Sequence, residues 1–204
     1  MKEVLIATNN KGKANDFEAL FKPLKVQVLT LNDIEGSIDV EETGITFEEN
    51  AILKAETVAR LLGKVVIADD SGLEIDFLDG APGVYSARFA GLEKNDDANI
   101  DKVLYELKTA SGGDRSARFR CVLAVAGPGL KTETFSGSCE GFINAKRQGS
   151  NGFGYDPIFF LPALNRTMAE LSAEEKSEIS HRGAALAQLK SKLPQYMSIL
   201  GDSV

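Results

Sequence analysis

Apolar and polar positions along the first half of the chain predict strands and helices in turn. Residues 4–7 and 26–29 are short, largely apolar runs that suit buried strands. Between them, apolar side chains recur at helical spacing over residues 17–21, and Pro23 ends that pattern. The order strand, helix, strand is typical of proteins in which helices pack against a sheet.

A second helix is predicted from the residues at its start. Thr46 followed three residues later by Glu49 is a capping box. The helix should run to about Leu62, where Gly63 is placed to end it. Its apolar stripe consists of Phe47, Ala51, Ala55, Val58, Ala59 and Leu62. Its polar residues on another face are Asn50, Lys54 and Thr57.

The second half of the chain adds longer strands. Further strands are predicted over residues 64–68, 73–77, 117–126 and 132–137, and a helix over 95–107. Asp69-Asp70-Ser71-Gly72 should break the strand that precedes it, and residues 149–156 form a Gly-rich loop. A second capping box, Ser172 with Glu175, opens a C-terminal helical segment that Pro194 ends. The order predicts an α/β protein with a mixed sheet.

Composition narrows the class of protein. The 204 residues suit one large domain or one domain with two lobes, and 43% hydrophobic residues are ordinary for a globular protein. The net charge of −7 leaves no basic footprint for nucleic acid, although local lysines or a divalent cation could still hold a polyanion. No apolar stretch reaches the ~18 residues of a membrane span, and no export signal is visible, so we expect a cytoplasmic protein. Cys121 and Cys139 form no metal-ligand pattern and are expected to be buried free thiols.

Two polar clusters in the first half could bind phosphate and metal. The turn over residues 8–13 lies between a strand and a helix start, where free N–H groups, Lys11 and Lys13 could cradle a triphosphate. A solvated turn with two surface lysines is the alternative. Glu41, Glu42 and the Asp69-Asp70 pair at the end of an apolar strand offer hard oxygen ligands for Mg²⁺. The alternative there is a simple turn at Asp70.

Two clusters in the second half could bind a base. In the loop, Phe153 or Tyr155 could stack on a flat ligand that the glycines allow to approach closely, or both could be core aromatics beside a turn. Lys176, His181 and Arg182 form a donor cluster able to bond base carbonyl oxygens. For His181, the only histidine, a solvated, capping or core role is the alternative.

Taken together, these segments resemble the inosine triphosphate pyrophosphatase family, also called the Ham1 or non-canonical purine NTP pyrophosphatase family. The matching pieces occur in the order known for that family and span nearly the whole chain. They are Thr8-Asn9-Asn10-Lys11-Gly12-Lys13, Glu41-Glu42-Thr43-Gly44, residues 50–55, Ala68-Asp69-Asp70-Ser71-Gly72-Leu73, residues 80–88, residues 152–159 and Ser180-His181-Arg182-Gly183. Asn9 stands where the family often has Gly, a modest departure that Asn tolerates well.

The resemblance implies two lobes around an elongated mixed sheet, with a nucleotide-binding cleft between them, in a typically homodimeric protein. It implies Mg²⁺-dependent hydrolysis of ITP, dITP and XTP to the nucleoside monophosphate and pyrophosphate. Removal of these nucleotides keeps deaminated bases out of nucleic acids.

The resemblance also implies roles for individual residues. Asp70 would accept a proton and bind metal, and Asp69 with Glu41 or Glu42 would complete the metal environment. Lys54 would add charge near the phosphates. The triphosphate would be held by Thr8, Asn9, Asn10, Lys11, Gly12 and Lys13. The nucleotide would be contacted by Ser71, Phe153, Gly154, Tyr155 and Asp156, with Phe153 against the base. The purine carbonyl edge would be bound by Lys176, His181 and Arg182.

Three other functions remain open on the sequence alone. One is a nucleotide-binding module without turnover, which the four carboxylates disfavour. Another is a Maf-like pyrophosphatase acting on modified pyrimidine nucleotides, which His181-Arg182 and Phe153 disfavour. The third is a nucleic-acid-binding protein, which the net charge of −7 disfavours.

Overall fold

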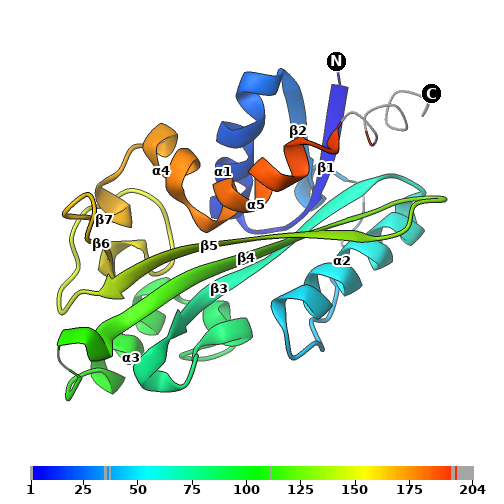
Figure 1. The fold of residues 1–204 in the computed structure, drawn as a ribbon. Helices are drawn as coiled ribbons and strands as arrows, with labels where there is room; N and C mark the ends of the chain where they lie inside the picture. Colours follow the sequence, from blue (N-terminus) through cyan, green and yellow to red (C-terminus); the bar gives the residue numbers. More distant parts are fainter. Residues whose placement is uncertain (1, 35, 37, 111, 194–195, 197–204) are drawn as a thin grey trace. The chain divides into compact units, whose positions relative to one another are not determined.

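The computed structural model describes residues 2–34, 36, 38–110, 112–193 and 196. Within them the strands form a seven-stranded sheet in the order β2-β1-β3-β4-β5-β6-β7 (Figure 1). β1 pairs in parallel with β2 and β3, whereas β6 is antiparallel to β5 and to β7. The strands are β1 (Lys2–Ala7), β2 (Val26–Thr30), β3 (Val66–Ile75), β4 (Ser116–Ala126), β5 (Glu133–Ile143), β6 (Phe159–Leu161) and β7 (Arg166–Thr167). The predicted α/β fold with a mixed sheet is confirmed.

The helices start near the predicted positions. The α-helices are α1 (Lys11–Phe21), α2 (Phe47–Leu62), α3 (Asp96–Glu106), α4 (Ala173–Ile179) and α5 (His181–Lys190). Short 3₁₀ segments are η1 (Lys22–Leu24), η2 (Leu31–Asp33), η3 (Asp76–Leu78), η4 (Gly83–Arg88), η5 (Gly112–Arg115), η6 (Asp156–Ile158) and η7 (Met168–Glu170). No helix among the described residues has the length and apolar character that crossing a membrane requires.

The chain divides into two compact units. The first comprises Met1–Asp70, Cys121–Gly137 and Arg182–Val204, and the second comprises Ser71–Arg120 and Ser138–His181. Strands β3, β4 and β5 each supply residues to both units. The prediction of one domain with two lobes stays a prediction.

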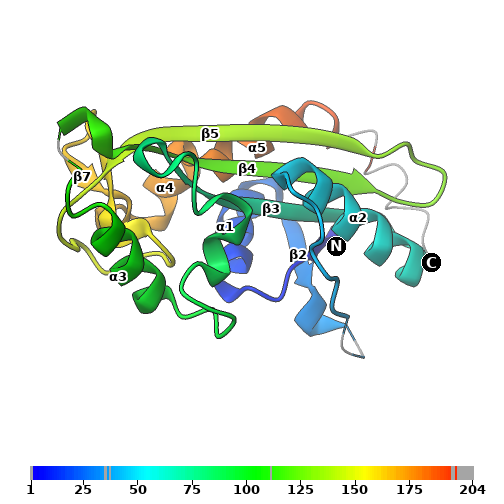
Figure 2. The same ribbon diagram turned by 90° about the horizontal axis from the view of Figure 1, so that it is seen from below.

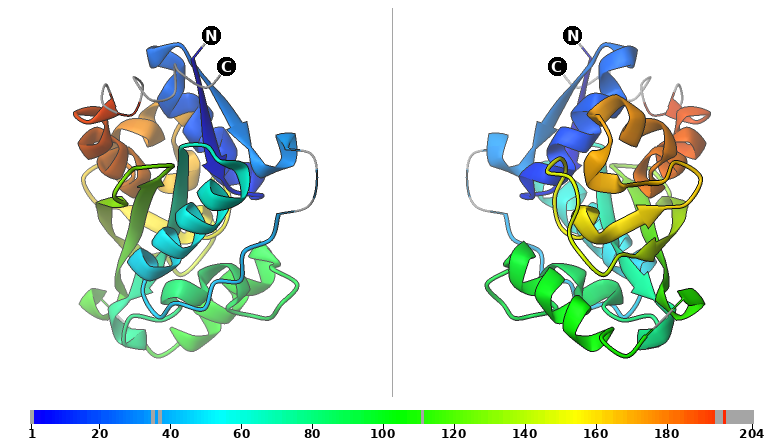
Figure 3. Two further views of the ribbon diagram at one scale, coloured as in Figure 1. Left: turned by 90° about the vertical axis from the view of Figure 1, so that its right-hand side faces the viewer. Right: turned by 90° about the vertical axis from the view of Figure 1, so that its left-hand side faces the viewer.

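In the first unit, α1 and α5 lie on one face of the strands and α2 lies on the other (Figures 1 and 3). Phe17 and Phe21 of α1 are fully buried, and their rings stack with centroids 6.4 Å apart. They join a core that includes Ile6, Leu123 and Leu186. The apolar positions of the N-terminal pattern therefore form the core of this unit.

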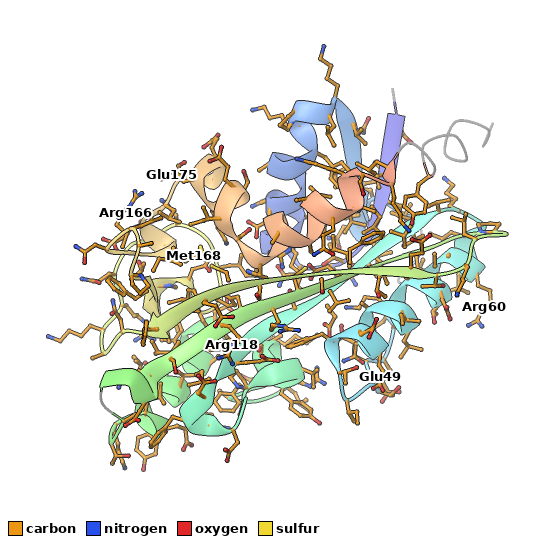
Figure 4. All side chains as sticks on the ribbon, in the orientation of Figure 1. Glu49, Arg60, Arg118, Arg166, Met168 and Glu175 are labelled. Atoms are coloured by element: carbon orange, nitrogen blue, oxygen red, sulfur yellow. The ribbon has the colours of Figure 1, made fainter. Side chains whose placement is uncertain are left out.

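In the second unit, α3 lies on one face of the strands and α4 on the other (Figures 1 and 2). Its core includes the fully buried Phe159 and Met168. Arg166 of β7 and Glu175 of α4 form a 2.7 Å ion pair that links two neighbouring elements of this unit (Figure 4). That link holds α4, which carries Lys176, beside the small β6–β7 pair.

Two predicted boundaries were wrong. β3 runs without interruption through the four residues expected to break it, so the turn at Asp70 does not exist. The C-terminal helical segment is divided at Ser180, whose extended backbone (ψ 159°) separates α4 from α5. The predicted stop at Pro194 lies outside the described residues.

The start of α2 follows the prediction in part. The Thr46 hydroxyl accepts a hydrogen bond from the Glu49 N–H, as in a capping box. The Glu49 carboxylate, however, bonds the N–H of Ile45 instead of that of Thr46. Gly63 ends the helix in the left-handed conformation, with φ at 63°. On the face expected to be polar, Asn50 and Lys54 are buried.

Candidate functional site

The adjacent carboxylates Asp69 and Asp70 lie in the middle of β3. β1 pairs with β3 only as far as Ala7 opposite Ala68, so both aspartates lie just beyond the carboxyl end of β1. Open α/β sheets bind ligands at such strand ends. The sequence prediction that both aspartates follow the end of their own strand was wrong, because β3 continues to Ile75. Both side chains are buried.

Asp69 is surrounded by donors from three other elements. Its Oδ1 lies 2.5 Å from Lys13 Nζ, and its Oδ2 accepts hydrogen bonds from Arg182 Nε at 2.9 Å and from the Cys121 thiol at 3.2 Å. Although burial alone would raise the pKa of Asp69, Arg182 and Lys13 hold it well below its usual range. Both oxygens are engaged within the protein. The carboxylate orients Lys13 and Arg182, and its expected role as a metal ligand stays a prediction.

Asp70 faces a different environment. Its Oδ1 lies 3.7 Å from Lys54 Nζ, and its buried Oδ2 has no hydrogen-bond partner among the described residues. Burial raises its pKa to about 6, against the opposing effect of Lys13 and Lys54. An unpartnered buried oxygen on a carboxyl that readily gains a proton suits a proton acceptor or a ligand of a hard cation.

Glu42, not Glu41, lies with these groups. Lys54 Nζ is 2.5 Å from Glu42 Oε1 and donates to the main-chain oxygen of Asp69 at 2.9 Å. Glu41 is exposed. No group of three or more His, Cys, Asp or Glu side chains in the described part of the chain is arranged to hold a metal. Glu42 and Asp70 still fit Mg²⁺, which needs only one or two protein carboxylates when substrate phosphates complete its shell.

The turn over residues 8–13 places one lysine in this cluster. Asn10 caps α1 by accepting a hydrogen bond from the Lys13 N–H, and Thr8 is buried beside it. Lys11 is exposed, whereas Lys13 reaches Asp69. Burial disfavours the charge of Lys13, yet Asp69 and Asp70 hold its pKa above the usual value. The helix start and Lys13 together offer N–H groups and positive charge to an anion.

In the second unit, the loop over residues 149–156 brings an aromatic ring and an ammonium group together. The Lys176 Nζ lies 2.7 Å from Asp156 Oδ2 and 4.8 Å from the centroid of the half-buried Phe153 ring. Tyr155 is buried, and its hydroxyl donates to the main-chain oxygen of Ser86 at 2.7 Å. Tyr155 therefore packs in the core, and its expected contact with a nucleotide stays a prediction.

His181 and Arg182 are neighbours in sequence with different surroundings. The buried His181 ring stacks on Phe119 in the second unit, with centroids 4.8 Å apart. Arg182 is 1% exposed in the first unit, where it also bonds Asp16 Oδ2 at 2.6 Å. The Arg182 guanidinium thus binds one buried and one half-buried carboxylate, and its expected contact with the base stays a prediction. Ser71 lies half-buried within β3.

Sequence reasoning did not mark Asp16 or Cys121 as partners in this cluster, and it named Asn50 only as part of a polar helix face. Asn50 lies one helical turn before Lys54, and its Oδ1 accepts a hydrogen bond from the Gly44 N–H at 2.8 Å. Its spacing from Lys54 was a usable signal. Cys121 sits in an apolar strand, where nothing in the sequence marks it as a partner of Asp69.

Comparison with known proteins agrees with the geometry. Residues 4–192 match the sequence model of the Ham1 family. The chain belongs to the Ham1 family. A dITP/XTP pyrophosphatase of Bacillus licheniformis is 55% identical over 195 residues, covering 96% of this chain and 100% of that relative. The Ham1 resemblance seen in the sequence motifs is confirmed.

Solved structures of Ham1 proteins match the fold. The Staphylococcus aureus Ham1 protein superposes with a TM-score of 0.82 at 50% identity, covering 95% of this chain and 99% of that one. A HAM1 protein from Coxiella burnetii gives a TM-score of 0.84 at 43% identity, covering 96% and 100%. The arrangement of helices and strands described above is therefore that of the Ham1 family.

Proposed function

We propose that this protein hydrolyses deaminated purine nucleoside triphosphates, namely dITP, ITP and XTP, to the nucleoside monophosphate and pyrophosphate with Mg²⁺. The observation that carries the proposal is the buried cluster beyond the end of β1, in which Asp70 has an unpartnered oxygen among the described residues beside two lysines. The 55% identity to a dITP/XTP pyrophosphatase supports the same reaction and substrates.

The charges in this cluster explain why a divalent cation is needed. Three cations face four carboxylates, so the cluster carries no surplus of positive charge. They are Lys13, Lys54 and Arg182 against Asp16, Glu42, Asp69 and Asp70. A triphosphate brings up to four further negative charges. When bound, Mg²⁺ would neutralise phosphate charge and polarise the phosphoryl oxygens, with Glu42 and Asp70 as its protein ligands.

The residues of the chain supply the remaining steps. The start of α1 and Lys13 bind phosphate oxygens, and Lys54 stabilises the negative charge that develops on the departing pyrophosphate. Asp70 takes the proton from the water that attacks the α-phosphorus, a contribution of typically 10²–10⁴-fold in rate. A carboxyl whose pKa lies near 6 is a stronger base than an ordinary aspartate and is still ionised at neutral pH.

The base end of the substrate would be bound by the second cluster. Phe153 offers a ring face, and Lys176 offers an ammonium that can donate to the 6-carbonyl of hypoxanthine or xanthine. ATP carries an amino donor at that position, and facing it with another donor leaves both unsatisfied. His181 remains a candidate for the same carbonyl edge.

We also propose, from the resemblance to the family, that the protein acts as a cytoplasmic homodimer. In this proposal the whole chain works as one domain with two lobes. Light scattering of the purified protein tests the dimer.

Product analysis tests the reaction. The purified protein is incubated with Mg²⁺ and ITP, dITP, XTP, ATP, GTP or a modified pyrimidine triphosphate, and products are resolved by ³¹P NMR. The expected result is pyrophosphate and monophosphate from the first three substrates at the highest kcat/KM, with Asp70→Asn as the inactive control. Release of single phosphate with accumulation of IDP contradicts the assigned bond, and a preference for the pyrimidine contradicts the substrate class.

A further inference from the structure

One buried carboxylate oxygen organises the loop that carries Phe153. Asp156 is 3% exposed, and its Oδ2 accepts hydrogen bonds from the Phe153 N–H at 3.0 Å and from Lys176 Nζ at 2.7 Å. The same oxygen therefore fixes the main chain that bears the ring and the ammonium that lies over it. Both groups belong to the second unit.

The loop is shaped around this oxygen. A Cβ at Gly152 would lie 2.0 Å from Asp156 Oδ2, and Gly152 has a φ of 76°, which favours glycine. A second acid, the exposed Asp96, holds the loop from outside by accepting a hydrogen bond from the Gly154 N–H at 2.8 Å. Asp156 forms an ion pair with Lys176, whereas Asp96 bonds the loop backbone.

The ion pair determines where the ammonium points. Lysine carries its charge on a flexible four-carbon stem with three rotatable donors, so its direction is set by its partners. The bond to Asp156 uses one N–H of Lys176 and thereby restricts the directions of the others. Without this bond, the ammonium would keep its charge and lose its fixed position over one face of the Phe153 ring.

We infer that Asp156 is a positioning residue for base selection: it aims the Lys176 ammonium at the 6-carbonyl of a purine stacked on Phe153. The inference rests on the proposed function and deepens it. It gives Asp156 a role beside the expected contact with the nucleotide, because its Oδ2 binds Lys176 and the loop backbone.

The test compares Asp156→Asn, Lys176→Gln and their double variant with the matched control Asp96→Asn. Asn keeps the size of Asp156 and can still accept the bond from the Phe153 N–H, but it loses the charge that holds the ammonium. Asp156→Asn should lower the ratio of kcat/KM for ITP to that for ATP by about 10-fold or more. The double variant should lose no more selectivity than Lys176→Gln alone, because both changes remove the same interaction.

Two further measurements separate positioning from folding. Asp96→Asn, which loosens the same loop, should keep the ITP-to-ATP ratio within about two-fold, because Asp96 bonds the Gly154 N–H and not the Lys176 ammonium. Competitive inhibition by pyrophosphate, which has no base, should be unchanged in Asp156→Asn. If Asp156→Asn does not fold, Asp156→Glu keeps the charge, displaces the carboxylate by one methylene, and must still lower the ratio.

Three results overturn the inference. One is an equal fall in kcat/KM for ITP and for ATP in Asp156→Asn. Another is a double variant whose ITP-to-ATP ratio falls by the product of the two single effects. The third is an unchanged ratio in Asp156→Glu. A wild-type protein that shows no preference for ITP over ATP contradicts the proposed function itself, and that failure is visible before any variant is made.

Discussion

Two neighbouring aspartates show how surroundings give one residue type opposite properties. Donors engage both oxygens of Asp69, so its pKa lies well below the usual range. Burial raises the pKa of Asp70 to about 6, and one of its oxygens has no hydrogen-bond partner in the described part of the chain. Asp69 therefore orients its neighbours, and Asp70 is the carboxylate to which we assign the proposed chemistry.

Asp70→Asn should stabilise the metal-free protein at neutral and alkaline pH. The pKa of Asp70 in the folded state lies above its unfolded value. The protonated side chain therefore adds to the free energy of unfolding, fully below about pH 4, and this stabilisation is lost as the pH rises through about 6. Removing the buried charge should raise the free energy of unfolding by up to about 3 kcal/mol at pH 8, and by little at pH 4. Urea unfolding in EDTA at both pH values measures this. If Asp70→Asn is less stable than the wild type at pH 8, favourable interactions of the ionised Asp70, such as that with Lys54, outweigh the cost of burying its charge.

Arg182→Ala should reduce stability and activity without changing base selection. It leaves the buried Asp69 carboxylate without one partner and removes a bond to Asp16, so we expect a loss of about 3–5 kcal/mol. Because Asp69 also orients Lys13, kcat/KM should fall by similar factors for ITP and ATP. Thermal melting and kinetics with both substrates check this, and a loss confined to ITP would restore the base-binding role expected from the sequence.

At the scale of elements, the first turn of α2 holds the segment that carries Glu42. Thr46 caps the helix, Glu49 bonds the Ile45 N–H, and Asn50 bonds the Gly44 N–H. A Cβ at Gly44 would lie 2.7 Å from Asn50 Oδ1 and 2.7 Å from Glu49 Cβ. The close approach of this segment to α2 therefore requires a residue without a side chain.

Gly44→Ala should shift Glu42 and weaken metal activation. We expect the Mg²⁺ concentration for half-maximal activity to rise several-fold, while the free energy of unfolding falls by about 1–3 kcal/mol, as for other overpacked sites. Gly63→Ala is the control, because it strains the other end of the same helix, where φ is 63°, and does not touch Glu42. An equal rise in the Mg²⁺ requirement of both variants would mean that helix stability, not the position of Glu42, controls metal binding.

Local signals in the sequence predicted the elements better than the site. Thr46, Gly63 and Ser172 mark helix ends through contacts within a few residues, and such contacts can be inferred from the sequence. The continuity of β3 could not be predicted in this way. Its Asp-Asp-Ser-Gly run has the local composition of a turn, and the partners of Asp69 come from positions 56 and 113 residues away. The same distance in sequence concealed the positions of Arg182 and Glu42.

At the scale of the whole molecule, the net charge of −7 predicts that anions bind only where charge is arranged locally. The cluster around Asp70 has more carboxylates than cations, so pyrophosphate alone should not bind it strongly. Pyrophosphate should bind together with Mg²⁺, because the cation neutralises the negative charge that repels the anion.

Thermal stability should therefore respond to Mg²⁺ and pyrophosphate jointly. A ligand at 100 times its Kd adds about 2.7 kcal/mol, which corresponds to a rise in Tm of about 5–10 °C for a chain of this size. Asp70→Asn should abolish most of this rise, and Lys11→Ala, which changes an exposed lysine of the turn, should lower it only modestly. A full response to pyrophosphate in EDTA would argue against a metal in the site.

The bond between the Cys121 thiol and Asp69 affects how readily that thiol is chemically modified. Burial and the Asp69 charge raise the pKa of this thiol well above its usual value, and burial also raises that of Cys139 to about 11. Oxidants, alkylating agents and nitrosating agents attack thiolates, and both sulfurs remain protonated at neutral pH. Nitrosating conditions also deaminate purine bases. We therefore expect both thiols to react slowly under the conditions that produce the proposed substrates.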